Sequence, residues 1–265
     1  MTLNIYGNKL RDFLQRISWF KFVFLLTTLL FALLLLLIIV SPVFIIKPSS
    51  FFDNIASTPL LFSITLSIIT SSVSTVLVMI FALPVSYCLS RFSFLGKDFI
   101  RTIVDIPFAF PETVLGLTLL LFFGHPIFSD FIPIVFTKKG IVVAQFFTAI
   151  SFAIRILKSS FDSIDTRVEL VSRSLGKSQI STFVNITIPL AKHGLVAALL
   201  ITFARCIGSF GAVLIVGGGM EQKTDTLPVF LFLNLSQGNV EMAITAGIIL
   251  IVISFISMYF IEKLN

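Results

Sequence analysis

Three ionisable side chains stand inside long apolar stretches of the sequence: Asp105, Glu112 and Arg205. A charge at bilayer depth costs about 2.5 to 3.5 kcal/mol even on lenient insertion scales, so each needs a partner or a task. At about 1.5 Å per residue, Glu112 lies about 16 Å beyond Arg101. Arg205 lies about 21 Å beyond Ala191 by the same count, so both stand near mid-membrane. We therefore predict that Glu112 and Arg205 are neighbours, either as a structural ion pair, which we favour, or as part of a solute passage.

Small residues surround these charges. The stretch around Asp105 is predicted to carry a small, acidic face that looks into a helix bundle, with two prolines kinking the helix. In the stretch after Arg205, Gly208 and Gly211 would let backbones approach closely, and Ser209 offers a hydroxyl. Close packing and solute contact are both open interpretations of that glycine-rich run. The acidic face consists of Asp105, Ala109, Glu112 and Gly116, and the prolines are Pro107 and Pro111.

Residues that could catalyse a reaction or bind a metal are scattered along the chain. His125 and His193 have no carboxylate, cysteine or serine arranged around them as a motif, which argues against a metal site or a catalytic triad. Cys88 and Cys206 fall inside apolar stretches and suit buried small side chains. The GKS at residues 176–178 lacks the earlier glycine and the preceding strand of a phosphate-binding loop. We therefore predict that this chain is not an enzyme and holds no metal or cofactor.

A long polar segment, residues 162–189, interrupts the apolar sequence and is called the elbow below. Its first half predicts an amphipathic helix with acids near its start and bases near its end, as the helix macrodipole favours. Gly176 can close this helix in the left-handed conformation, Ser178 can cap a second one, and Pro189 should stop it. We interpret the elbow as a docking device; an ordinary amphipathic loop on the membrane surface is the alternative. The apolar face comprises Ile164, Val168, Val171 and Leu175, and the charged residues include Asp162, Asp165, Arg167, Glu169, Arg173 and Lys177.

The composition is that of a membrane protein. Of 265 residues 57% are hydrophobic and 12% charged, 31 are phenylalanine, and the mean hydropathy is +1.07. Such a chain is too apolar for a soluble globule. We predict an all-α, polytopic transmembrane helical bundle of about six spans. The expected spans are residues 22–46, 60–89, 102–123, 140–157, 190–216 and 242–261.

The basic residues are distributed unevenly between the two sides of this bundle. Fourteen lysines and arginines fall on the side of the termini and the elbow, whereas the other side holds only Lys47, Lys138, Lys139 and Lys223. The positive-inside rule then places both termini and the elbow in the cytoplasm and the chain in the inner or plasma membrane. The net charge of +6 lies between apolar runs, so we expect a lipid membrane and no nucleic acid as partner. The expected domains are a cytoplasmic segment (1–21), a transmembrane domain (22–261) with a coupling loop (158–190), and a tail (262–265).

The elbow resembles the EAA loop of ABC-importer permeases. The resemblance is carried by Glu169, by Gly176 seven residues on, and then by Ile186, Ile188 and Pro189. The departures are Leu170 and Val171 in place of two alanines, and Ile188 in place of leucine, which make the loop bulkier. The resemblance implies a type I ABC-importer permease fold, in which this loop sits in a groove of a separate ATP-hydrolysing subunit. The coupling residues would be Asp165, Glu169, Arg173, Gly176, Ile186 and Pro189.

Three further segments are similar to molybdate and tungstate permeases and, more loosely, to sulfate permeases. They are residues 106–116 (IPFAFPETVLG), 205–211 and 223–228 (KTDTLP), and the similarity runs from Leu60 to the C-terminus. Two departures stand out, because relatives often carry an acidic residue where Ser209 stands and a proline where Glu112 stands. A carboxylate has then moved between helices while Arg205 keeps a partner.

The resemblance implies the permease subunit of an ATP-driven importer of a tetrahedral oxyanion, most simply molybdate or tungstate. ATP and Mg²⁺ would bind the partner subunit, a second copy of the chain would complete a homodimer, and an external solute-binding protein would contact Thr224, Asp225 and Thr226. Sulfate or another small solute is the alternative within this class. An ion-coupled secondary transporter using Asp105 and Glu112 is the rival from another class, and an intramembrane enzyme is disfavoured by the lack of a nucleophile with a base.

Overall fold

The computed structural model describes residues 19–263, and the chain divides into two compact units, residues 1–47 and 48–265. In the first unit, α2 (Trp19–Ile45) is apolar on every side and buries no residue. A helix that is apolar all round is typical of a membrane span. It coincides with the first predicted span, whereas most of the predicted cytoplasmic segment, residues 1–18, lies outside the described residues.

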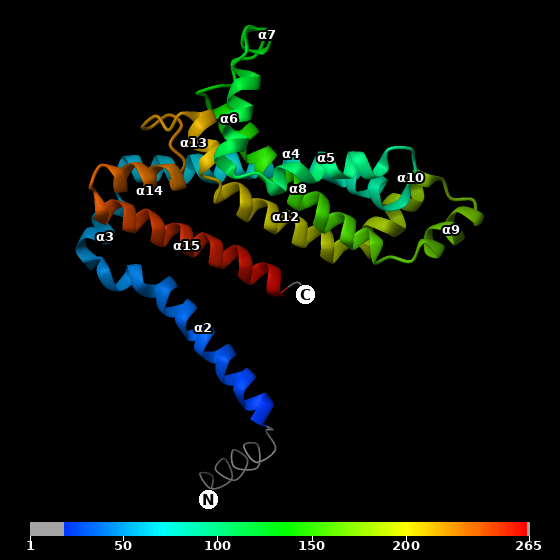
Figure 1. Ribbon diagram of the computed structural model, residues 1–265, viewed down its shortest axis with the longest axis horizontal. Helices are drawn as coiled ribbons and strands as arrows, with labels where there is room; N and C mark the ends of the chain where they lie inside the picture. Colours follow the sequence, from blue (N-terminus) through cyan, green and yellow to red (C-terminus); the bar gives the residue numbers. More distant parts are fainter. Residues whose placement is uncertain (1–18, 264–265) are drawn as a thin grey trace, which may run out of the picture. The chain divides into compact units, whose positions relative to one another are not determined.

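The second unit is a bundle of helices (Figure 1). Its elements are α3 (Pro48–Ile55), α4 (Thr58–Arg91), α5 (Lys97–Ala109), α6 (Glu112–Phe123), α7 (Pro126–Ser129), α8 (Lys138–Asp162), α9 (Thr166–Ser174), α10 (Gln179–Thr182), a π-helix (Phe183–Thr187), α11 (Ile188–Leu190), α12 (Lys192–Ile207), α13 (Gly211–Gly217), α14 (Leu227–Ser236) and α15 (Val240–Lys263).

The centre of this bundle is formed by α4, α8 and α12, which lie side by side (Figure 1). Hydroxyl residues along α4 are buried against α8, and they bond across the helix pair. Ser74 Oγ donates to Gln145 Oε1 (2.9 Å), and Gln145 Nε2 donates to Ser71 Oγ (3.2 Å). Small polar side chains let helices approach closely where water is absent, which explains the serine-rich sequence of the second predicted span.

Two predicted spans are broken, and the break in the first of them is sharper than the expected proline kink. The 102–123 stretch forms α5 and α6, bent by 112°. Phe110 precedes Pro111 and takes an extended conformation (φ −77°, ψ 138°), because a residue before proline is disfavoured in the α region. Asp105 and Glu112 therefore do not share one helical face. The 190–216 stretch likewise splits into α12 and α13, separated at residues 208–210.

The second helical segment of the elbow ends at Leu190, one residue after the expected stop at Pro189. Proline has no N–H to continue the α-helical ladder, and the preceding residues form a π-helix in which the Ile188 N–H bonds to the Phe183 carbonyl. The chain then turns at Ala191, so that the segment from Gln179 to Leu190 and α12 are bent by 75°. Among the described residues, four helices are long and apolar enough to cross a membrane, or six if each bent pair makes one span.

The C-terminal part of the second unit is a helix pair, in which α14 packs on α15. Helix α3 also contacts α15, where Asn54 Nδ2 donates to Thr245 Oγ1 (3.0 Å). Leu60, Leu227, Phe230 and Ala246 form a small apolar core between these elements and α4. The sixth predicted span, residues 242–261, lies within α15.

Candidate functional site

The elbow is built from short helices whose ends are capped by their own side chains. Asp165 accepts from the N–H of Arg167 (2.9 Å) at the start of α9, and Ser178 accepts from the N–H of Ser181 (3.1 Å) at the start of α10. Gly176 has φ +86° and closes α9 in the left-handed conformation, as the sequence predicts. These caps fix the bend between the two helices.

Helix α9 buries two polar side chains and leaves its apolar side chains exposed. Glu169 and Ser172 are buried, whereas Leu175 is 79% exposed and Ile180, in α10, is 78% exposed. Of the predicted apolar face only Ile164 is buried, and Val168, Val171 and Leu175 are exposed. An exposed apolar patch outside the lipid-facing helices marks an interaction site. The patch comprises Val168, Leu170, Val171, Leu175, Ile180 and Val184 and is called the elbow patch below.

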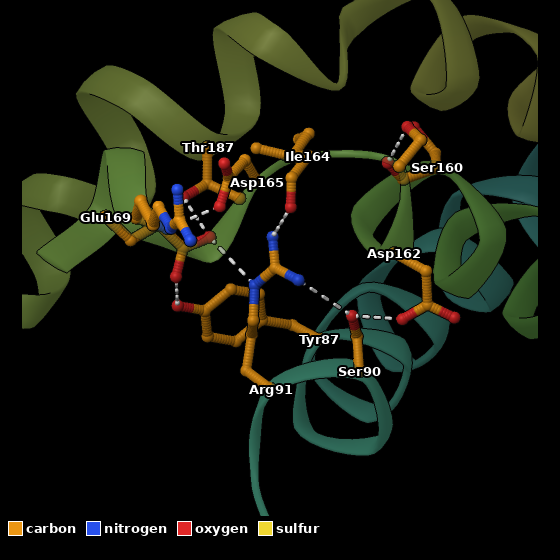
Figure 2. Close-up of polar contacts among 11 residues, drawn as sticks. Tyr87, Ser90, Arg91, Ser160, Asp162, Ile164, Asp165, Glu169 and Thr187 are labelled. Carbon is orange, nitrogen blue, oxygen red and sulfur yellow. Dashed lines mark hydrogen bonds and ion pairs between the residues drawn. The ribbon is translucent and has the colours of Figure 1, made fainter.

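Glu169 is held inside the chain by three donors from two other segments (Figure 2). Arg91 Nε donates to Oε1 (3.0 Å), Thr187 Oγ1 donates to the same oxygen (3.0 Å), and Tyr87 Oη donates to Oε2 (3.1 Å). The side chains of Arg91 and Glu169 are only 7% and 10% exposed. A buried ion pair is tolerated when its remaining donors and acceptors are satisfied, as they are here. Glu169 therefore ties α9 to the end of α4.

Arg91, the last residue of α4, also reaches the other end of the elbow (Figure 2). Its Nη2 donates to the carbonyl of Ile164 (3.0 Å) and its Nη1 to Ser90 Oγ (3.3 Å). Ser90 Oγ in turn donates to Asp162 Oδ1 (2.6 Å). One guanidinium therefore fixes both the entry of the elbow and the middle of α9. Beside it lies an open, mainly apolar groove of about 500 Å³ between α4 and the elbow.

The second candidate site is the charge pair between α6 and α12. Arg205 Nη2 lies 3.4 Å from Glu112 Oε1, so the two residues are in contact. Glu112 Oε2 accepts from the N–H groups of Phe210 (3.2 Å) and Gly211 (3.3 Å). The Arg205 guanidinium lies over the ring of Phe152 in α8, 4.3 Å from its centroid, which is cation–π distance.

Asp105 belongs to a different pair. Its Oδ1 accepts from Arg155 Nε (2.8 Å), and the Arg155 guanidinium lies 4.0 Å from the ring centroid of Phe108. The sequence prediction had grouped Asp105 with Glu112 on one face, and the break between α5 and α6 separates them. The centroids of the Phe108 and Phe152 rings lie 4.8 Å apart with the rings tilted by 54°, so the two pairs are joined through contacting aromatic side chains.

The glycine-rich run has two different members. A Cβ at Gly211 would lie 3.1 Å from Thr113 Cγ2 and 3.3 Å from Glu112 Cβ, so this glycine permits the approach of α6. A Cβ at Gly208 would meet only the Ala204 carbonyl of its own helix, so no close approach of another helix depends on it. Ser209 is buried, and its Oγ has no partner among the described residues.

The three residues expected at an external mouth are buried, which corrects their interpretation as an exposed contact for a partner protein. Thr224, Asp225 and Thr226 each expose at most 2% of their surface. Ser63 Oγ donates to Asp225 Oδ2 (3.2 Å), and Thr224 Oγ1 accepts from the N–H of Met220 (2.9 Å). Burial raises the pKa of Asp225 above its ordinary value, although the hydrogen bond from Ser63 opposes the rise.

Several residues of these sites have no signal in the sequence pattern. Arg91 and Tyr87 look like the ordinary polar end of a span, and Arg155 looks like a flanking cation. Phe108 and Phe152 are two among 31 phenylalanines. Only the position of Arg91 in the last turn of a long helix, where a cation meets the negative end of the macrodipole, could have drawn attention.

A bundle of apolar helices, two of them broken, with a polar elbow tied to one helix end defines a multi-pass membrane protein of the permease class. The comparison with known families is specific: residues 79–265 match the model of the binding-protein-dependent transport system inner membrane component. This chain belongs to that family of permease subunits.

Named relatives and a solved structure agree with this assignment. A probable molybdenum ABC transporter permease protein of Haloferax volcanii is 32% identical over 84% of this chain and 82% of its own length. A probable sulfate transport system permease protein of Chlorokybus atmophyticus is 32% identical over 81% of this chain and 78% of its own. A bacterial alginate ABC transporter, solved in complex with a periplasmic protein, aligns with a TM-score of 0.75 at 15% identity, covering 92% and 93% of the two chains. The last likeness concerns the fold alone.

Proposed function

We propose that this ABC-importer permease subunit carries a tetrahedral oxyanion, molybdate or tungstate, and is driven by a separate ATP-hydrolysing subunit that grips the elbow. The observation that carries the coupling role is the elbow patch, an exposed apolar surface on a helix that buries Glu169 and Ser172. Glu169 is then an internal anchor, and the partner would contact Leu175, Ile180 and their apolar neighbours. Helix-in-groove binding of this kind passes a partner's rotation on as a rigid-body shift.

The choice of solute rests on the relatives and on the chemistry of the interior. The Haloferax relative is named for molybdenum, and the Chlorokybus relative is named for sulfate. Two arginines of the second unit, Arg155 and Arg205, have side chains that are 46% and 39% exposed, which suits contact with a small dianion. Sulfate is the alternative, because these anions share charge and shape and differ mainly in size. An external binding protein would deliver the anion, and a second copy of the chain would complete the passage.

Transport in proteoliposomes tests the solute and the energy source together. The chain, its ATPase and its binding protein are reconstituted, and uptake of radiolabelled molybdate is measured with and without ATP. We expect uptake that requires ATP and is competed by tungstate more strongly than by sulfate. Equal competition by sulfate would favour the sulfate alternative, and uptake that follows an ion gradient without ATP would establish a secondary transporter instead.

The elbow patch is tested with charged substitutions. Leu175→Glu and Ile180→Glu place a carboxylate in the proposed interface, so both should release the ATPase during purification and abolish uptake. Leu95→Glu is the matched control, because Leu95 is a fully exposed leucine in the link between α4 and α5. Retention of the ATPase by both elbow variants would contradict the docking role.

A further inference from the structure

The two members of the charge pair between α6 and α12, Arg205 and Glu112, differ in the number of hydrogen bonds that they make. The Arg205 guanidinium has five N–H donors, but it makes a single 3.4 Å contact with Glu112. Its Nε is buried without a partner among the described residues. Arginine–carboxylate pairs that serve structure are commonly bidentate, with contacts of about 2.7 to 2.9 Å. Although Nε is buried, the Arg205 side chain is 39% exposed and its guanidinium is engaged by Glu112 at one nitrogen only.

Glu112, in contrast, is fixed in place. One carboxylate oxygen accepts from the N–H groups of Phe210 and Gly211, while only the other faces Arg205. A Cβ at Gly211 would lie 3.3 Å from Glu112 Cβ, so the glycine lets the Glu112 carboxylate reach these two backbone N–H groups. The negative charge of Glu112 is thus a permanent neighbour of the Arg205 guanidinium.

We propose, on the basis of the oxyanion transport proposed above, that Arg205 is a contact for the passing oxyanion and that Glu112 is a fixed counter-charge that keeps this contact weak. A conducting site must bind its solute well enough to admit it and weakly enough to release it. An isolated guanidinium on an aromatic ring would retain a dianion. The carboxylate beside it repels the same dianion and shortens its stay.

A second arginine, Arg155, has the same kinds of partner as Arg205, a carboxylate and an aromatic ring. Arg155 pairs with Asp105 and stacks on Phe108, whose ring contacts that of Phe152 beneath Arg205. The Arg155 side chain is 46% exposed and lines a cavity of about 380 Å³, which Arg101 and Lys158 also line. An anion released by Arg205 would thus meet a second guanidinium that is likewise paired with a carboxylate. Two weak binding sites in succession let the anion pass, whereas one strong site would hold it.

Equilibrium binding tests the counter-charge directly. The purified permease–ATPase complex in nanodiscs, without nucleotide or binding protein, is titrated with radiolabelled tungstate. Glu112→Gln keeps the shape of the side chain and removes its charge, so it should bind tungstate about tenfold tighter or more than the wild type, because a like charge no longer opposes the anion. Adding Arg205→Gln to this variant should abolish the gain. Glu241→Gln, an exposed glutamate at the start of α15, is the matched control and should leave affinity unchanged.

Transport by the complete system provides the second readout. Glu112→Gln should hydrolyse ATP but take up tungstate more slowly than the wild type, because the anion leaves Arg205 slowly. If Glu112→Gln does not fold, Glu112→Asp withdraws the carboxylate from Arg205 and should still tighten binding by a smaller factor. Unchanged tungstate affinity in whichever of these variants folds would overturn the inference while wild-type ATP-driven uptake still stood. Absence of that wild-type uptake would instead refute the proposed function.

Discussion

Arg91 is the residue on which the position of the elbow depends most. It contacts the Glu169 carboxylate, the Ile164 carbonyl and Ser90, so one side chain joins α4 to two points of the elbow. No other residue type offers a planar set of donors that can serve three acceptors in different directions. Lysine would keep the charge but would lose at least one of these contacts.

Replacing Arg91 should uncouple the elbow from the bundle. Arg91→Met leaves the Glu169 carboxylate buried without its cation, which costs about 3 to 5 kcal/mol of stability. We expect a lower melting temperature in detergent and loss of the ATPase on purification. Combining Arg91→Met with Glu169→Leu should recover part of the stability, because replacing both charges by apolar groups is tolerated better than removing one. Lys139→Met removes an exposed cation and serves as control; an equal effect there would contradict a specific role of Arg91.

Asp225 predicts a pH dependence of stability. Burial raises the pKa of this carboxyl, and Glu221 adds to the rise. The native state therefore holds a proton at pH values where the unfolded chain has lost it, so stability should fall as pH rises from about 4 through the raised pKa. Asp225→Asn should flatten that slope in melting curves measured across this range. Asp53→Asn, at an exposed position, should not; if it flattens the slope equally, Asp225 is not the source.

At the scale of the elements, the elbow depends on one backbone conformation. Gly176 has φ +86°, and a Cβ there would meet no atom within 4 Å, so a substitution would strain the backbone without a clash. Gly96, in the link between α4 and α5, has nearly the same conformation (φ +82°) and equally open surroundings. The two glycines differ only in the segment that they shape.

This pair separates general strain from elbow geometry. Gly176→Ala and Gly96→Ala should each lose about 1 to 2 kcal/mol of stability, because an L-residue is disfavoured in the left-handed region. Only Gly176→Ala should also reduce ATPase binding and uptake, since only it changes the angle between α9 and α10. Gly176→Asn should restore much of the loss, because asparagine tolerates this conformation. Equal loss of uptake in both alanine variants would mean that the elbow angle is unimportant.

The elements that the sequence predicts well are those determined by neighbouring residues. The cap at Ser178 and the turn at Gly176 are local, and they are present. The prolines of the 102–123 stretch predict an interruption there, but a proline inside an apolar run does not show whether the result is a kink or the full break before Glu112. The direction of the α9 apolar face could not be predicted, since periodicity identifies a face but not whether it meets its own chain or a partner.

Most contacts between residues far apart in the sequence could not be predicted, because a local pattern does not specify a distant partner. Arg91 and Glu169 are 78 residues apart, and nothing in either local pattern specifies the other. The Glu112–Arg205 contact, 93 residues apart, could be anticipated because lipid makes an unpaired charge costly at a known depth. An unpaired Asp105 would be equally costly in lipid. Its partner was not predicted, because Arg155 looked like an ordinary cation at the end of a span.

At the scale of the whole molecule, the distribution of basic residues makes a prediction about orientation. Fourteen lysines and arginines accompany the termini and the elbow, and four lie on the other side. Because cationic loops stay on the cytoplasmic side during insertion, the link between α4 and α5 should face the cytoplasm. The segment between α6 and α8 should face the exterior. These two segments contain Leu95 and Phe131, both strongly exposed.

Cysteine labelling in intact cells decides this orientation. Leu95→Cys and Phe131→Cys are made separately in a chain whose Cys88 and Cys206 are replaced by serine. A membrane-impermeant maleimide should label position 131 in intact cells, and position 95 only after the cells are opened. Labelling after permeabilisation shows that each cysteine is accessible and reactive, and ATP-driven uptake by each variant shows that it is folded; the two together serve as the control. The reverse pattern would place the elbow outside the cell, where no ATPase could reach it, so orientation and coupling would be contradicted together.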